Sequence, residues 1–121
     1  RAAHFFDESR RVNHGLSAWE AGDLEAFGRL MTESGRSSID NYECGSEPLI
    51  ALYDILLATE GVVGARFSGA GFRGCCVALV HRSASDAACE HVRKAYSDRY
   101  PDLAGGAPVF CCESDDGARI L

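Results

Sequence analysis

The chain has 121 residues, of which 46% are hydrophobic and 25% are charged. That length suits one domain with its own core, and the composition is typical of a globular protein. The formal net charge is −6 and the basic residues form no stripe, which argues against a nucleic-acid partner. Apolar runs stay well short of the ~20 residues that span a bilayer, so a membrane partner is not expected.

The amino-terminal residues give the first indication of a larger protein. The chain does not begin with Met, and residues 3–20 already follow a helical pattern with no signal-peptide region before it. We therefore expect the chain to start inside a longer polypeptide, and we expect that polypeptide to be cytoplasmic.

Six cysteines occur, and four of them form two adjacent pairs, Cys75 with Cys76 and Cys111 with Cys112. Neighbouring residues of a strand point to opposite faces, so the members of one pair cannot share a partner. No Cys-x-x-Cys is present, which removes the usual zinc and redox signature. We expect six buried free thiols in a reducing compartment, which agrees with the cytoplasm.

Helical periodicity predicts two helices at the start of the chain. The first covers residues 3–20, and Gly22 and Asp23 then supply a stop and the N-cap of the second. The second helix is expected to end near Gly35, and residues 36–46 are expected to be irregular. The predicted inward-facing stripes are Phe5, Val12, Leu16 and Trp19 on the first helix and Leu24, Phe27, Leu30 and Met31 on the second.

A third helix is predicted after Ser46, which can serve as its N-cap, with Pro48 tolerated in the first turn. Gly61 ends this segment. The apolar stripe of the third helix consists of Leu49, Leu52, Tyr53, Leu56 and Leu57.

Beyond Gly61 the hydrophobic period changes from 3.6 to 2, which predicts a strand over residues 63–68. The glycine-rich residues 69–74 then turn the chain into a second strand at 75–80. A helix is expected at 85–99, capped by Ser83 or Ser85. Its predicted inward-facing side chains are Ala88, Val92 and Tyr96.

Two more strands are predicted near the end of the chain, Pro108–Cys112 and residues 119–121. The helices and strands together indicate an α+β domain over residues 1–121, with helices packed on one face of a small antiparallel sheet.

Residues 69–74 have the pattern Gly-x-Gly-x-x-Gly, which several phosphate-binding loops share. A dinucleotide-binding loop needs a helix after it, and here a strand follows. A protein kinase needs a strand lysine, and the one lysine, Lys94, lies in a predicted helix. A Walker A loop needs Gly-Lys-Ser/Thr, which is missing. Two interpretations remain open: a loop whose N–H groups bind an anion, helped by Arg66 and Arg73, or a plain hairpin turn.

A longer match specifies this loop further. Residues 61–76, GVVGARFSGAGFRGCC, resemble the third conserved motif of galactokinase-type GHMP kinases, Gly-x-x-Gly-Ala/Ser-Arg-Met/Phe-Ser/Thr-Gly-Gly/Ala-Gly-Phe-x-Gly-Cys. Segments 1–8, 26–34, 41–44 and 116–119 are similar to other segments of the same region, in the same order. The likeness covers essentially the whole chain.

The resemblance implies a ferredoxin-like GHMP kinase C-terminal domain with extra helices at its amino-terminal end. It implies that Gly69, Ala70, Gly71 and Gly74 lie on the phosphate side of the active site. The family's nucleotide motif, Pro-x-x-x-Gly-Leu-x-Ser-Ser-Ala, and its catalytic Asp and supporting Arg belong to an N-terminal domain. This chain therefore holds no catalytic residue by that comparison, and alone it is expected to be inactive.

The same resemblance names the expected ligands. The intact protein would use ATP and Mg²⁺, bound mainly by the N-terminal domain, and would phosphorylate a sugar at C1. Galactokinases usually carry Gly where this chain has Arg73, and this departure, with the Cys75-Cys76 pair, is more similar to galacturonokinase. Arginine binds carboxylates through a fork of N–H donors, so Arg73 is a candidate for contacting a uronate. It could equally contact a phosphate or nothing.

Two alternatives to a galacturonokinase stay open on the sequence. One is a galactokinase that acts on galactose, and the other is a non-catalytic galactokinase-like sensor. A metal site is not expected: His4, Asp7 and Glu8 share one helix turn, but a solvated helix face explains them better. His81, Cys89 and His91 have no recognised ligand spacing either.

Overall fold

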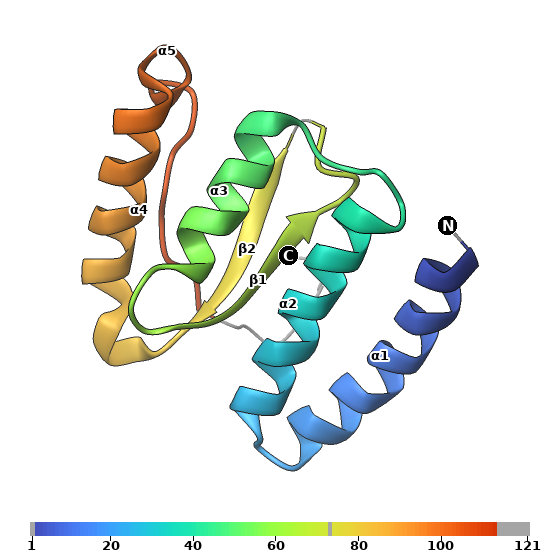
Figure 1. Ribbon diagram of the computed structural model, residues 1–121. Helices are drawn as coiled ribbons and strands as arrows, with labels where there is room; N and C mark the ends of the chain where they lie inside the picture. The colour runs from blue at the N-terminus through green and yellow to red at the C-terminus, as the bar shows by residue number, and fades with distance from the viewer. Residues whose placement is uncertain (1, 73, 114–121) are drawn as a thin grey trace, which may run out of the picture.

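The computed structural model describes residues 2–72 and 74–113 (Figure 1). Three helices come first, then a hairpin of two strands, then one long and one short helix. Their bounds are α1 Ala2–Glu20, α2 Leu24–Asp40, α3 Glu47–Leu57, β1 Val62–Ser68, β2 Cys75–Val80, a 3₁₀ turn Arg82–Ala84, α4 Ser85–Arg99 and α5 Pro101–Ala104. The predicted α+β class is confirmed, and so is the predicted order of elements from α1 to α4.

The connection between α1 and α2 follows the predicted turn chemistry. Gly22 has φ +69°, which suits a residue without a side chain, and the carboxylate of Asp23 accepts a hydrogen bond of 2.9 Å from the N–H of Ala26. The two helices therefore run back to back as an antiparallel pair (Figure 1).

The predicted end of α2 at Gly35 is wrong, because the helix continues to Asp40. A Cβ at Gly35 would lie 2.6 Å from the Tyr53 ring, so this glycine allows close packing and does not stop the helix. Of residues 36–46, which were expected to be irregular, residues 36–40 therefore belong to α2. Ser38 is accommodated in the helix by donating its hydroxyl to the carbonyl of Ser34, at 2.9 Å.

The stripe predicted to face inward on α1 is exposed instead. Phe5, Val12, Leu16 and Trp19 are 66, 69, 59 and 51% exposed. Of the four, Trp19 makes a ring contact with Phe27 of α2, with centroids 5.1 Å apart. None of the described helices has the length and apolar character needed to cross a membrane.

The third helix forms the core with β1. Leu49, Tyr53, Ala65 and Phe67 make one buried cluster, and the hydroxyl of Tyr53 donates to the carbonyl of Thr32 at 2.7 Å. The Tyr53 side chain is therefore buried with its hydroxyl hydrogen-bonded. The expected cap Ser46 occupies the N-cap position, but its side chain makes no cap hydrogen bond.

The two strands pair antiparallel, with Arg66 opposite Val77 and Phe67 opposite Cys76. Phe67 and Cys76 pack toward the α3 side, whereas Val77, on the opposite face, is 44% exposed. Within the described residues, helices thus cover one face of the sheet, as predicted.

The predicted third strand at Pro108–Cys112 is wrong for the described residues, whose sheet has two strands. This segment is extended but forms no strand, because its contacts go to side chains of α4; for example, Arg93 Nη2 donates to the carbonyl of Val109 at 3.1 Å. The predicted fourth strand at 119–121 lies outside the described residues. Ahead of α4, neither Ser83 nor Ser85 is the N-cap, since that position belongs to Ala84.

The closest packing in the domain joins the backbones of α2 and β1. A Cβ at Gly64 would lie 2.1 Å from the carbonyl oxygen of Gly28, and one at Gly28 would lie 2.4 Å from that of Val63. Only glycine on both elements permits this distance. The position of β1 relative to α2 is therefore set by two missing side chains.

Replacing Gly64 by alanine should lower the free energy of unfolding by about 1–3 kcal/mol, because the new methyl group meets backbone that cannot rotate away. Gly105→Ala is the matched control, since its Cβ would meet nothing within 4 Å and should change stability by less than ~0.5 kcal/mol. Denaturant unfolding of the intact protein measures both. Equal stability of the two variants would contradict the packing described.

Candidate functional site

The loop between β1 and β2 is a tight connection with three left-handed glycines. Gly69, Gly71 and Gly74 have φ values of +92°, +75° and +128°, a region that side chains strongly disfavour. The structure therefore brings together all four residues predicted to lie on the phosphate side, namely Gly69, Ala70, Gly71 and Gly74. Arg73, the predicted sugar-binding residue, lies outside the described residues.

Gly71 anchors the loop to the core. A Cβ there would lie 2.5 Å from the Phe67 ring, and the Gly71 carbonyl accepts a 2.7 Å hydrogen bond from the N–H of Ser46. Phe67 is 2% exposed, so the loop rests on a fixed base. Through this bond the backbone of Ser46, at the N-cap position of α3, joins the start of the helix to the loop.

The flanks of the loop remain open. Gly69, Ala70 and Gly74 are exposed, and the N–H groups of Gly69 and Ala70 donate to no other backbone group of the described residues. Free N–H groups on left-handed glycine backbone are the arrangement that binds anionic oxygens. The loop has donors available for a phosphate.

Phe72 is a loop residue that the sequence analysis did not single out. Its side chain is 59% exposed and lines an open apolar groove of about 970 Å³ between α3, β2, α4 and residues 103–112. The motif itself contains this Phe, so the signal was present. Because the groove is lined mostly by apolar side chains, it suits a charged phosphate poorly, and the loop is the better candidate.

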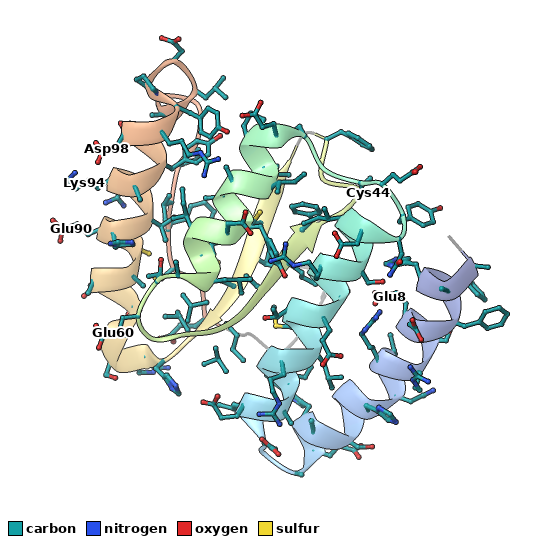
Figure 2. The ribbon with its side chains drawn as sticks, in the orientation of Figure 1. Glu8, Cys44, Glu60, Glu90, Lys94 and Asp98 are labelled. Carbon is teal, nitrogen blue, oxygen red and sulfur yellow. The ribbon has the colours of Figure 1, made fainter. Side chains whose placement is uncertain are left out.

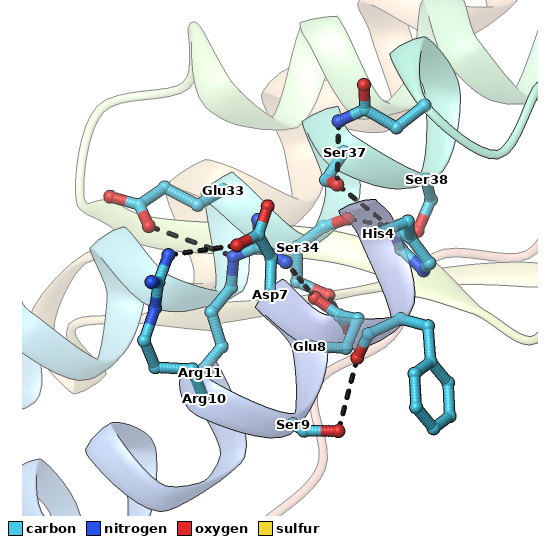
Figure 3. A network of polar contacts seen from close by, with 12 residues as sticks. His4, Asp7, Glu8, Ser9, Arg10, Arg11, Glu33, Ser34, Ser37 and Ser38 are labelled. Carbon is cyan, nitrogen blue, oxygen red and sulfur yellow. Dashed lines mark hydrogen bonds and ion pairs between the residues drawn. The ribbon is translucent and has the colours of Figure 1, made fainter. Parts of the chain in front are cut away.

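A carboxylate of α1, that of Glu8, links α1 to α2 and β1 (Figure 3). Glu8 accepts a 2.7 Å hydrogen bond from the hydroxyl of Ser34 and pairs with Arg11 of its own helix. Its other neighbour is Arg66 of β1, whose Nη1 lies 3.8 Å away. Arg66 also donates from Nε to the carbonyl of Phe67, so its charge lies at the end of β1 that enters the loop.

The expectation that His4, Asp7 and Glu8 form a solvated helix face is wrong for two of them. The Nδ1 atom of His4 lies 3.0 Å from the hydroxyl of buried Ser37, and Glu8 is in the cluster just described. Asp7 does pair on the surface, with Arg10 at 2.9 Å. Among the described residues, no group of three or more His, Cys, Asp and Glu is placed to hold a metal ion.

The environment of Glu8 favours its charged form. Burial alone would raise the pKa of this carboxyl, but hydrogen bonds from Ser34 and Arg11 and the positive charges of Arg11 and Arg66 outweigh it and lower the pKa below 4.5. The carboxylate is thus ionised at neutral pH and stabilises the packing of α1 on α2 and β1.

The expectation of six buried thiols holds for Cys44 alone, because Cys76 and Cys89 are half-buried and the other three are exposed. All six cysteines are free, but Cys75, Cys111 and Cys112 are exposed, because Cys75 ends the open face of the sheet and the other two lie in the unpaired segment. Cys44 is buried, and burial raises the pKa of Cys76 to about 12. Half-buried Cys76 packs against the core cluster and is therefore a packing residue with little reactivity.

Replacing Glu8 by Gln should lower the free energy of unfolding by about 1–3 kcal/mol at pH 7, because charge-assisted hydrogen bonds are lost. A lowered folded-state pKa stabilises the fold above pH 4.5 and ceases to do so as the pH falls through the folded value. The difference between wild type and variant should therefore narrow on acidification below pH 4.5.

Thermal unfolding of both proteins from pH 7 to about pH 3 measures this difference. The matched control is Glu90→Gln, which changes an exposed carboxylate on α4 (Figure 2). This variant should be as stable as the wild type at every pH of the series. A difference between wild type and Glu8→Gln that stays constant with pH would show that the charge of Glu8 contributes nothing.

Comparison with known proteins agrees with this geometry. Residues 16–98 match the family model described as GHMP kinases C terminal. A galacturonokinase of Arabidopsis thaliana is 54% identical over 125 residues and human galactokinase is 40% identical over 121 residues; both alignments cover the whole chain but only 30% and 29% of those proteins. The chain thus spans about a third of the length of these relatives.

A solved structure with this fold is Lactococcus lactis galactokinase, crystallised in complex with galactose. It superposes with a TM-score of 0.70 and 34% identity, covering 82% of this chain and 24% of that one. The family match covers more than half of the chain, including β1, the glycine loop and β2. The chain belongs to the GHMP kinase C-terminal family.

Proposed function

We propose that this chain is the C-terminal domain of an ATP-dependent sugar 1-kinase, and that the intact protein phosphorylates galacturonate at C1. One observation carries the proposal: a hairpin loop with three left-handed glycines, anchored at Gly71 and open at its flanks, in a chain of this family. Higher identity to a galacturonokinase than to the galactokinases supports galacturonate as the sugar.

In this proposal the loop stabilises negative charge. The N–H groups of Gly69, Ala70 and Gly74 turn toward phosphate oxygens, and because the loop is held on Phe67 they need not reorganise when charge develops. Arg66 adds a positive charge at the end of β1, at a position that Glu8 holds. Phosphoryl transfer depends largely on such positioning and charge stabilisation.

The remaining machinery belongs to an N-terminal domain of the same polypeptide. That domain would hold ATP, Mg²⁺ and the catalytic residues, while this chain supplies the glycine loop and one wall of the cleft. Because no single part of such a site suffices, the chain alone is expected to be inactive. We place the intact protein in the cytoplasm.

We further propose that Arg73 selects the sugar. Galacturonate carries a carboxylate that galactose lacks, and a guanidinium matches a carboxylate through paired N–H donors. Arg73 lies in the loop sequence between Gly71 and Gly74, next to the proposed phosphate-side residues. An arginine at this position would therefore bind the uronate more tightly than the neutral sugar.

A galactokinase is the second candidate, favoured by the likeness to a structure crystallised with galactose. A non-catalytic sensor of the same fold is the third. An intact catalytic Asp and nucleotide-binding serine loop in the N-terminal domain would indicate an enzyme, and their loss would indicate a sensor.

A phosphoryl-transfer assay of the intact protein on galacturonate, galactose and arabinose tests both proposals. We expect kcat/KM to be highest for galacturonate, and we expect Arg73→Gly to lower it about 10–100-fold for galacturonate while changing it little for galactose, because only the uronate loses a charged contact. Lys94→Ala, which removes a positive charge on α4, is the matched control and should change neither value.

The outcomes separate the candidates. A wild-type preference for galactose would favour a galactokinase. A preference for galacturonate that is lost in Arg73→Gly and kept in Lys94→Ala would support the carboxylate contact. An unchanged preference in that variant would exclude the role of Arg73 without affecting the kinase proposal. Absence of phosphoryl transfer to all three sugars would contradict the proposal that the intact protein is a sugar kinase.

A further inference from the structure

The extended residues 107–113 lie along α4 in a regular register. Ser85, Cys89 and Arg93 are spaced four apart, so they share one face of α4. Along the segment, Arg93 Nη2 donates to the carbonyl of Val109 at 3.1 Å, and the Sγ of Cys111 lies 3.7 Å from the carbonyl of Ser85 and 2.9 Å from the Sγ of Cys89.

This register has a simple geometric basis. Four residues of a helix rise about 6 Å, and two residues of an extended chain span about 6.6 Å, so alternate residues of the segment meet successive turns of α4. The order is antiparallel, and it continues at the start of the helix, where Arg82 pairs with Glu113 at 2.8 Å. The contact between Cys89 and Cys111 is thus part of a row of contacts.

The two sulfur atoms are well placed for a bond. A disulfide has an S–S distance of about 2.05 Å, so the sulfur atoms of Cys89 and Cys111, now 2.9 Å apart, need to approach by less than about 1 Å. Cys111 is exposed and Cys89 is half-buried, so a small oxidant reaches Cys111 first. Successive side chains of an extended segment point to opposite sides, which excludes Cys112 from the same partner.

We propose that Cys89 and Cys111 form a reversible redox pair whose disulfide fastens residues 107–113 to α4. The oxidant is a hydroperoxide, for which hydrogen peroxide is the simplest probe. This modification site is independent of the proposed kinase activity, because neither cysteine belongs to the glycine loop.

The chemistry takes two balanced steps. The sulfur of Cys111 attacks one peroxide oxygen; an S–O bond forms, the O–O bond breaks, and one water leaves with the thiol proton, so that Cys111 becomes a sulfenic acid. The sulfur of Cys89 then attacks the Cys111 sulfur; the S–S bond forms, the S–O bond breaks, and a second water leaves with the Cys89 proton. An external dithiol reverses the result by exchange, becoming a disulfide itself.

The ionisation of Cys89 agrees with this order. The hydrogen bond with Cys111 and burial raise the pKa of Cys89 to about 11, so while Cys111 is reduced the Cys89 thiol is protonated at neutral pH and reacts poorly with peroxide. Arg93, one turn along α4, and Asp86 act on Cys89 in opposite directions. The more exposed Cys111 is therefore the residue that meets the peroxide.

The disulfide would have a defined structural effect. Residues 107–112 form one wall of the apolar groove, and α4 and β2 form two others. In the reduced protein this wall is held by the Arg93 bond and the thiol contact, both exposed. The disulfide would hold it covalently and would close a loop between residues 22 apart in sequence, which restricts the unfolded chain.

The test uses the intact protein, fully reduced and then titrated with hydrogen peroxide. Free thiols are alkylated, the protein is digested with trypsin, and the peptides are identified by mass spectrometry. We expect a cross-linked peptide pair containing Cys89 and Cys111, lighter by two hydrogens than its parts, which dithiothreitol abolishes. The oxidised protein should also melt at a higher temperature than the reduced one.

Serine variants locate the bond. Cys89→Ser and Cys111→Ser should each lose the cross-linked pair and the shift in melting temperature. Cys112→Ser is the matched control, exposed and adjacent in sequence, and it should retain both. The proposal is overturned if wild-type Cys111 proceeds to sulfinic acid while Cys89 stays alkylated, or if Cys112→Ser loses the cross-link as Cys111→Ser does.

Discussion

The backbone contact between α2 and β1 is the constraint on which the rest of the domain depends. Gly28 and Gly64 allow the helix and the strand to approach until carbonyl oxygens lie where side chains would otherwise stand. The same approach sets α2 beside Tyr53, across the missing side chain of Gly35, and so joins α2 to the core under α3. It also presents Ser34 to Glu8, so that α1 is held by polar contacts even though its apolar stripe faces solvent.

A rigid β1 gives the glycine loop a fixed origin. Phe67, the penultimate residue of the strand, is buried against Tyr53, and its ring packs against Gly71. The N–H of Ser46 donates a hydrogen bond to the carbonyl of Gly71. The anchor at Gly71 orders the loop, while the exposed flanking residues stay accessible to a ligand. It keeps the free N–H groups of the loop in place without occupying them, which is the requirement for binding an anion with little reorganisation.

Much of this could be predicted from the sequence, and the failures share a physical cause. Periodicity predicted α1 to α4 and the hairpin, and the glycines of residues 69–74 predicted the turn between its strands, whereas α5 was not predicted. The end of α2 was missed because Gly35 looks like a stop signal, whereas its role is a tertiary contact with Tyr53 that no local pattern reveals. The exposure of the α1 stripe and the unpaired state of Pro108–Cys112 depend on what packs against them, which periodicity cannot specify.

The central claim is that the amides of the glycine loop bind phosphate, and glycine amide resonances test it most directly. The intact protein, labelled with ¹⁵N-glycine, is titrated with a non-hydrolysable ATP analogue and Mg²⁺. The account predicts saturable shifts for Gly69 and Gly74, with Gly105, which lies in the turn after α5, unmoved. Saturation of other resonances while Gly69, Gly71 and Gly74 stay fixed would contradict it.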